Sequence, residues 1–291
     1  MFYKSVLLIF AAAIGLPFIS LAIGERNPAG ARAGAMGGVS VSVSDIWSAS
    51  NNPAGTAWLK GVSAGIFFEN RFMMKELMYQ QGVAVLAVKP GSFAINLSHF
   101  GALGYLEFRS GFSYSRKFGK MFSAGIRLEY LRLSLPDDYG SKNLLSCAIG
   151  LQFRPTDRIL AGILIANPVP VRTANQPVEY LPTVFCAGVS YRFSENFLAV
   201  LEVEKDLIQS MVIRMGAEYQ IAGKLFIRAG LATNPWVVTF GFGLKLGKLT
   251  VDLASGFHQA LGFSPGGSVI FQNIKESGNK RKTDASQRSG L

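Results

Sequence analysis

Apolar and polar residues alternate one by one along many short segments of this chain after residue 60. In residues 122–130 every even position is apolar, from Phe122 to Tyr130, while the odd positions hold Ser, Gly, Arg and Glu. Such alternation predicts β-strands whose two faces meet different surroundings, because successive side chains of a strand point to opposite sides. The same alternation recurs in residues 145–154, 185–193, 211–220 and 238–246.

The composition of the two faces distinguishes between β-architectures. A soluble sandwich would also alternate, but its outer faces would be rich in Lys, Glu and Thr. Here the polar faces hold mostly Gly, Ser, Ala and a few charges, which suits the crowded interior of a barrel. The apolar faces end in aromatic residues, as the interfacial girdles of membrane barrels do. These terminal aromatics include Tyr130, Phe153, Phe193 and Tyr219.

The spacing of the segments predicts an all-β, antiparallel transmembrane barrel of 14 strands. The candidate strands begin near residues 61, 78, 91, 104, 120, 142, 158, 181, 195, 210, 223, 236, 249 and 265. Every second connection is a tight turn, such as Phe118-Gly119-Lys120 and Ala222-Gly223-Lys224, as expected on the periplasmic side. The intervening connections are longer and are expected outside the cell: Asn70 to Leu77, Leu135 to Lys142, Asn167 to Tyr180, and His258 to Pro265.

Residues 1–24 have the pattern of a secretory signal peptide. Lys4 gives a positive start, Val6–Ile19 is an apolar stretch, and Ser20-Leu21-Ala22 offers the small residues of a cleavage site. The alternative is an uncleaved anchor helix. We therefore expect an exported protein whose mature chain begins after residue 24.

No segment beyond residue 24 is long enough to cross a membrane as a helix. The best apolar run, Ile159–Ala166, has eight residues, against the roughly 20 that a spanning helix needs. The mean hydropathy of the chain is nevertheless positive, at +0.28. Because backbone groups in lipid must be paired internally, a closed barrel remains as the solution. We expect residues 60–273 to form it in a bacterial outer membrane, with membrane lipid as a partner.

Residues 25–59 and 274–291 lie outside the predicted barrel. The first stretch is rich in Gly and Ala, and we expect it to fold into the lumen as a plug, with a periplasmic strap or a first strand pair as the alternative. Its Asp45 is expected to cap a helical turn that Pro53 ends. The second stretch is polar and basic and is expected to be a disordered periplasmic tail. The plug residues singled out are Asp45, Trp47, Asn51, Asn52 and Pro53.

The charge balance is strongly basic, with 29 Lys and Arg against 18 Asp and Glu and a net charge of +11. The basic residues are dispersed along the chain, apart from a cluster at Lys280, Arg281 and Lys282. Because no nucleic-acid-binding motif accompanies them, we expect no nucleic-acid partner. By strand parity Cys147 and Cys186 face opposite ways, so they are not expected to form a disulfide.

Candidate catalytic residues are scarce. The chain has two histidines: by parity His99 lies on the lipid side of its strand, and His258 begins a connection. A hydrolase needs a nucleophile, a base and an acid within hydrogen-bond reach. The sequence also shows no compact carboxylate cluster and no Gly-rich loop with phosphate-binding spacing. We therefore expect no catalysis, no metal and no cofactor.

Charged residues on the polar faces of the strands are better functional candidates, because a charge in a narrow lumen needs a partner or water. One interpretation is a ladder of salt bridges that stiffens the barrel and seats the plug. The other is a lining that selects what passes. The charges expected to point inward are Arg127, Glu129, Arg192, Arg214, Glu218 and Lys245.

The two ends of the chain resemble a known family. The stretch Gly30 to Asp45 (GARAGAMGGVSVSVSD), with Asn52-Pro53-Ala54-Gly55 after it, resembles the N-terminal pattern of the PorV/PorQ family. The closing Phe257 to Pro265 (FHQALGFSP) resembles the last hairpin of that family. These are outer-membrane proteins of Bacteroidetes within the wider FadL-like superfamily. The middle of the chain matches only in pattern.

The resemblance implies a fourteen-stranded barrel with an N-terminal segment in its lumen. From the PorV/PorQ branch it implies a non-enzymatic accessory in protein secretion or surface assembly, of the type IX secretion kind, with protein partners in that machinery. From the FadL branch it implies the alternative, a transporter of hydrophobic small molecules across the outer membrane. The external connections of this chain are shorter than those expected of a shuttle that grips protein cargo.

Overall fold

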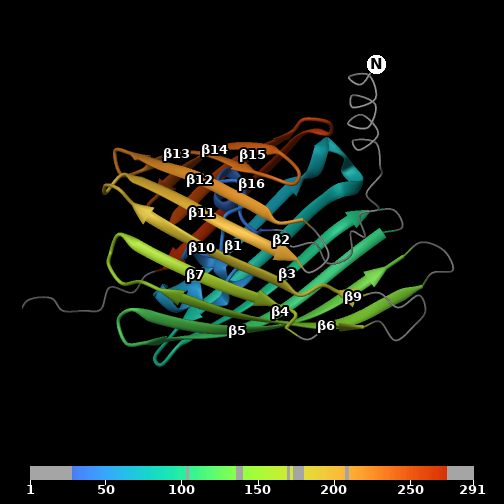
Figure 1. Cartoon of the computed structure of the whole chain (residues 1–291), viewed down its shortest axis with the longest axis horizontal. Coiled ribbons are helices and arrows are strands. Elements are labelled where there is room, and N and C mark those ends of the chain that lie inside the picture. Colours follow the sequence, from blue (N-terminus) through green and yellow to red (C-terminus); the bar gives the residue numbers. More distant parts are fainter. Residues whose placement is uncertain are drawn as a thin grey trace, which may run out of the picture.

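A computed structural model describes residues 28–102, 105–135, 140–168, 171–172, 180–206 and 210–273. Fourteen antiparallel strands form one closed barrel, in which β1 pairs with both β2 and β16 and β7 pairs with β10. Figure 1 shows the tilted strands around the blue N-terminal segment. The predicted fold, a 14-stranded antiparallel barrel with an N-terminal segment in its lumen, is confirmed. The expected signal peptide and basic tail lie outside the described residues.

The strand boundaries follow the alternating segments of the sequence. The barrel strands are β1 (Gly61–Asn70), β2 (Met78–Ala87), β3 (Ser92–Ala102), β4 (Tyr105–Phe118), β5 (Phe122–Ser134), β6 (Ser141–Phe153), β7 (Ile159–Ala166), β10 (Val184–Arg192), β11 (Phe197–Asp206), β12 (Val212–Ile221), β13 (Leu225–Ala232), β14 (Val237–Leu246), β15 (Leu249–His258) and β16 (Gly262–Asn273). Two short strands, β8 (Val171–Arg172) and β9 (Tyr180–Leu181), pair with each other in the connection between β7 and β10.

One end of the barrel carries only short turns, and the other carries the long connections together with some short ones. The short turns are residues 88–91, 119–121, 154–158, 193–196, 222–224 and 247–248. We call this the short-turn end and the opposite one the long-loop end. β1 begins and β16 ends at the short-turn end, where Val62 pairs with Asn273. In bacterial membrane barrels the short turns face the periplasm.

Outward and inward side chains differ as the alternation predicts. On β5, Ile126 and Leu128 are exposed on the outer surface, whereas Arg127 and Glu129 are buried inside. Exposed apolar side chains around the barrel make an outer surface suited to lipid. Among the described residues, no helix is both long and apolar enough to cross a membrane.

The last hairpin differs from the prediction. A long connection was expected from His258 to Pro265, but β15 reaches His258 and β16 begins at Gly262, so residues 259–261 form a tight turn. Pro265 therefore lies within a strand, which proline tolerates where its missing N–H breaks no ladder. The pairing of β16 with β1 stops at Gly266, one residue beyond Pro265, so this proline sits at an unpaired edge.

The N-terminal segment forms three short helices inside the barrel. They are α2 (Ala31–Ala35) and the 3-10 helices η1 (Ile46–Ala49) and η2 (Pro53–Trp58). Two further 3-10 turns, η3 (Arg71–Met73) and η4 (Lys75–Leu77), lie in the connection between β1 and β2. We call residues 28–59 the plug segment. Pro53 begins η2 rather than ending the preceding turn, because proline fits the first position of a helix.

Candidate functional site

The plug segment touches the barrel wall so closely that the wall needs glycine at the contacts. A Cβ atom on Gly216 would lie 2.6 Å from Met36 Cβ, and one on Gly230 would collide with the backbone of Met36 and Gly37. Gly162 on β7 is blocked in the same way by the carbonyl of Val41. These glycines on the polar faces of the strands therefore make room for the plug segment.

Polar side chains of the wall satisfy the backbone of the plug segment. The Glu202 carboxylate accepts hydrogen bonds from the N–H groups of Ser40 (2.7 Å) and Val41 (2.8 Å). Thr239 Oγ1 accepts from Gly37 N (2.8 Å). Because the irregular backbone leaves these N–H groups without partners of their own, the wall replaces the hydrogen bonds of secondary structure.

The predicted plug residues all lie in this buried segment. Asp45 caps η1 by accepting from Trp47 N at 2.9 Å, and the Trp47 side chain is fully buried. The Asn51 side chain joins both backbone groups of Ala29, at 2.8 and 3.0 Å. Asn52 donates to the Val41 carbonyl at 2.8 Å. These side chains fold the plug segment back on itself.

A chain of alternating charges runs from the plug segment into the wall. Arg32 of α2 binds Glu218 through both carboxylate oxygens, at 2.8 and 2.7 Å. Glu218 also accepts from Arg228 (2.7 Å), which in turn donates to Asp252 (2.6 Å). Bidentate charge-assisted pairs of this kind are the strong ones.

The electrostatics of this chain of alternating charges favour a charged Arg32. Burial disfavours the guanidinium, but the attraction of Glu218 outweighs it and raises the pKa of Arg32. Asp45 lies 3.6 Å from Arg32, and burial nevertheless raises the pKa of this carboxyl above its ordinary value. Glu218 is thus the main counter-ion of Arg32.

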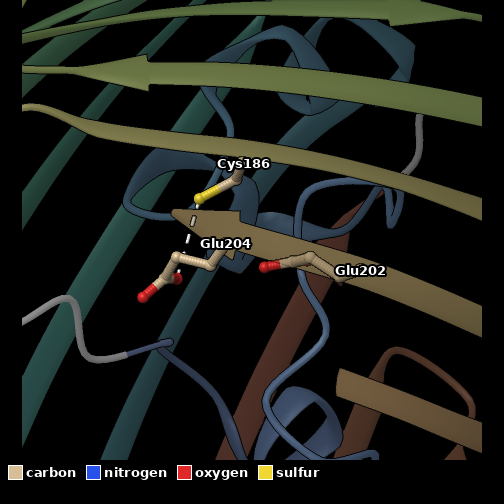
Figure 2. Close-up of side chains that lie close together, drawn as sticks. All are labelled: Cys186, Glu202 and Glu204. Carbon is tan, nitrogen blue, oxygen red and sulfur yellow. Dashed lines mark hydrogen bonds between the residues drawn. The ribbon is translucent and has the colours of Figure 1, made fainter. Parts of the chain in front are cut away.

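A second cluster joins four wall residues of β10, β11 and β12. Arg214 donates to both oxygens of Glu204, at 2.7 and 3.3 Å. Cys186 Sγ donates to Glu204 Oε2 at 3.6 Å, and Glu202 lies beside them (Figure 2). The ligand atoms of Cys186, Glu202 and Glu204 lie within 4.8 Å of one another, a spacing that could hold a metal ion. The carboxylates already accept from Arg214 and from the plug backbone, so the geometry describes a seat for the plug segment.

A small polar cavity lies between the plug segment and the opposite wall. Its volume is ≈ 60 Å³, and it is lined by Ser50 of the plug segment and by inward side chains of β2 to β10. Glu129 is held there by Arg109 (3.6 Å), Arg127 (3.7 Å) and Asn96 (3.2 Å). The Arg127 guanidinium also donates to the carbonyl of Ser50. Water or a polar group suits this cavity better than an alkyl chain.

Of the six charges predicted to line the lumen, four are buried there. Arg127 and Glu129 border the cavity, Arg214 joins Glu204, and Glu218 joins Arg32. Arg192 and Lys245 have the inward parity but are exposed at the short-turn end of their strands. The structure therefore separates the six into four places. It also brings in partners that the sequence analysis did not single out: Arg32, Glu107, Arg109, Glu202, Glu204, Arg228 and Asp252.

The histidines lie away from these clusters. His99 is exposed on the outer surface of β3. His258 ends β15, where its Nδ1 accepts from the N–H groups of Ala260 (3.2 Å) and Leu261 (3.1 Å). It therefore serves the last tight turn.

The outer surface carries an apolar hollow over β1, β2 and β3. Two adjoining parts of ≈ 400 and ≈ 440 Å³ share Ile66, Gly82 and Leu97. The hollow arises because β2 presents the small residues Gly82 and Ala84 outward. Gln81 lines both this hollow and the internal cavity, so a single layer of wall separates them. β2 pairs with both neighbours along this stretch, and the wall is closed there.

Comparison with known proteins places the fold. No protein-family model and no curated protein matches the chain. The CymD monoaromatic hydrocarbon channel is 14% identical over 84% of this chain and 97% of its own, with a TM-score of 0.64. The Ralstonia pickettii toluene transporter TbuX is 12% identical over 83% and 96%, with a TM-score of 0.64. A Pseudomonas aeruginosa FadL homologue is 11% identical over 84% and 97%, at 0.63. This chain therefore has the same barrel fold as these proteins.

Proposed function

We propose that this protein is a channel in the bacterial outer membrane for hydrophobic small molecules, the FadL-like alternative of the sequence analysis. Two of the similar structures are described as a hydrocarbon channel and a toluene transporter. The apolar outer surface of the barrel suits a membrane, and this fold suits the outer one. Because a fold hosts several functions, the proposal depends on the site as well.

The observation that carries the proposal is the meeting of an internal cavity with an external apolar hollow at the β2–β3 wall. Gln81 and Ser98 line both. On the inside Gln81 donates to Ser50 Oγ of the plug segment. A molecule leaving the lumen for the membrane at this place would have to pass a single layer of wall, beside Gln81 and Ser98.

The described conformation is closed. A cavity of ≈ 60 Å³ is smaller than the roughly 150 Å³ that an engineered protein core uses to bind benzene. Passage of an aromatic molecule therefore requires Ser50 to move away from Gln81 and Arg127.

Filling the outer hollow tests the proposal. Gly82→Phe should leave the barrel folded, because a Cβ at Gly82 meets no atom within 4 Å. In bacteria with an intact lipopolysaccharide outer membrane, it should reduce toluene uptake to that of bacteria without the protein. The matched control is Ala217→Phe, an outward small residue on β12 at a distance from the hollow. Uptake that persists in a folded Gly82→Phe protein, or that falls equally in both variants, would contradict the proposed route.

The PorV/PorQ-like secretion role stays a prediction. Two of the structures compared above are described as a channel and a transporter, which supports transport more than secretion. Affinity capture of the native protein from outer membranes distinguishes the two. A secretion accessory should bring down the same protein partner in stoichiometric amount, and a barrel recovered without one would count against that role.

A further inference from the structure

Basic residues that are far apart in the sequence gather at the short-turn end of the barrel. They lie in the turns or at the adjoining strand ends, and we call them the basic rim. They are Lys60, Lys89, Arg116, Lys117, Lys120, Arg154, Arg158, Arg192, Lys224, Lys245 and Lys248. The acidic residues of the same turns are Asp157 and Glu195. Every second connection of a barrel lies at the same end. Basic residues that are dispersed along the sequence therefore form a ring at this end.

The two ends of the barrel differ in charge. Counted to two residues inside the strand ends, the basic rim sets eleven basic side chains against two acidic ones, whereas the described residues of the long-loop end carry seven basic and five acidic ones. Those of the long-loop end are Glu69, Arg71, Lys75, Glu76, Glu107, Arg132, Lys142, Arg172, Glu204, Lys205, Asp206 and Arg214. Most of the net charge of +11 is thus concentrated at one end.

The basic rim is available to an outside partner. Apart from Arg154, its members are exposed. In the part of the chain that the structure describes, none of them forms an ion pair. Lys117 and Arg154 turn toward the lumen, where they lie 5.4 and 4.3 Å from the Trp58 ring centre. Lys89, Lys120 and Lys224 lie in their turns and are exposed.

We propose that the basic rim binds anionic phospholipid headgroups of the membrane leaflet that surrounds the short-turn end. Each of the six short turns, with its strand ends, contributes at least one basic residue, so the charge encircles the barrel as a lipid annulus does. Exposed aromatic side chains lie just inside this ring: Phe118, Phe122, Phe193 and Tyr219. Aromatics at the interface with basic residues beyond them match the depth of headgroups.

The test compares lipids around the reconstituted wild-type barrel. In phosphatidylcholine bilayers at low salt, spin-labelled phosphatidylglycerol should associate roughly fivefold more strongly than spin-labelled phosphatidylcholine. The preference should largely disappear in 1 M salt, because screening then acts over about 3 Å. Equal association of the two lipids at low salt would overturn the proposal. This measurement needs no variant, so a folding defect cannot obscure it.

A pair of matched variants locates the effect. Lys89→Gln/Lys120→Gln/Lys224→Gln should lower the phosphatidylglycerol preference, whereas Lys75→Gln/Arg132→Gln/Lys205→Gln at the long-loop end should leave it unchanged. A preference that falls equally in both variants would contradict a site at the basic rim. Binding of soluble polyglutamate by a barrel without lipid preference would assign the rim to an acidic protein instead and overturn the proposal.

Discussion

Each of the buried charges described in the lumen lies within 4 Å of an opposite charge. Arg228 is the central example, because it joins Glu218 at 2.7 Å and Asp252 at 2.6 Å while being only 4% exposed. Removing one partner from such a group leaves an uncompensated buried charge, which costs far more than the intact pair contributes. The consequence for stability can therefore be predicted one residue at a time.

Arg228→Leu should destabilise the folded barrel by about 3–5 kcal/mol, because it leaves the Asp252 carboxylate buried without its arginine. Urea unfolding in lipid vesicles, followed by tryptophan fluorescence, measures the change. Arg228→Leu/Asp252→Leu should recover part of the loss, since both charges are then absent. A double variant less stable than Arg228→Leu alone would show that burial of the charge is not the cause.

The odd or even position of a residue within an alternating strand was enough to predict the inward direction of some of these charges, but not of all of them. Arg214 and Glu218 lie on a cleanly alternating strand, so parity turned them inward. Glu202 and Glu204 lie two residues apart on β11, which is a usable signal, but the start of that strand is apolar on both faces. The partner of Glu218, Arg32, is 186 positions away, and no local pattern connects the two.

At the scale of elements, the plug segment and the wall are shaped for each other. The predicted strand starts lie within about three residues of the observed ones, because alternation and turn residues are local signals. The path of the plug segment could not be predicted in this way. It depends on where inward glycines of several strands leave room, and that arrangement exists only after the barrel has closed.

Gly230→Ala should loosen the plug segment while leaving the strands paired. The added Cβ would meet the backbone of Met36 and Gly37, and overpacking of this kind costs about 1–3 kcal/mol. Trypsin cleavage after Arg32, detected by mass spectrometry of the folded barrel, should become faster. Gly82→Ala is the control, because its Cβ points to open space on the outer face. Equal cleavage of the two variants would mean that Gly230 does not hold the plug segment.

At the scale of the whole molecule, closure of the barrel creates properties that no segment has alone. The outer surface becomes continuous and apolar, and the basic residues of separate turns become one rim. The basic residues are dispersed along the chain, as the sequence analysis found, but in the folded barrel many of them lie together. Arg192 and Lys245 were predicted to line the lumen because alternation along a strand shows whether a side chain faces inward or outward. It does not show how far along the barrel axis the side chain lies. Their position at the strand ends places them in the rim.

The final prediction concerns the lipid-facing surface. Ile126 is 46% exposed on the outer face of β5, where neighbouring strands also present apolar side chains. Ile126→Arg should destabilise the barrel in bilayers by about 2–4 kcal/mol, because a guanidinium near the middle of the membrane loses its hydration. Met74→Arg, at an exposed position of the β1–β2 connection, should change stability by no more than about 0.5 kcal/mol. Both are measured by urea unfolding from the same vesicles. If the two substitutions had equal effects, the outer surface of β5 would not face lipid.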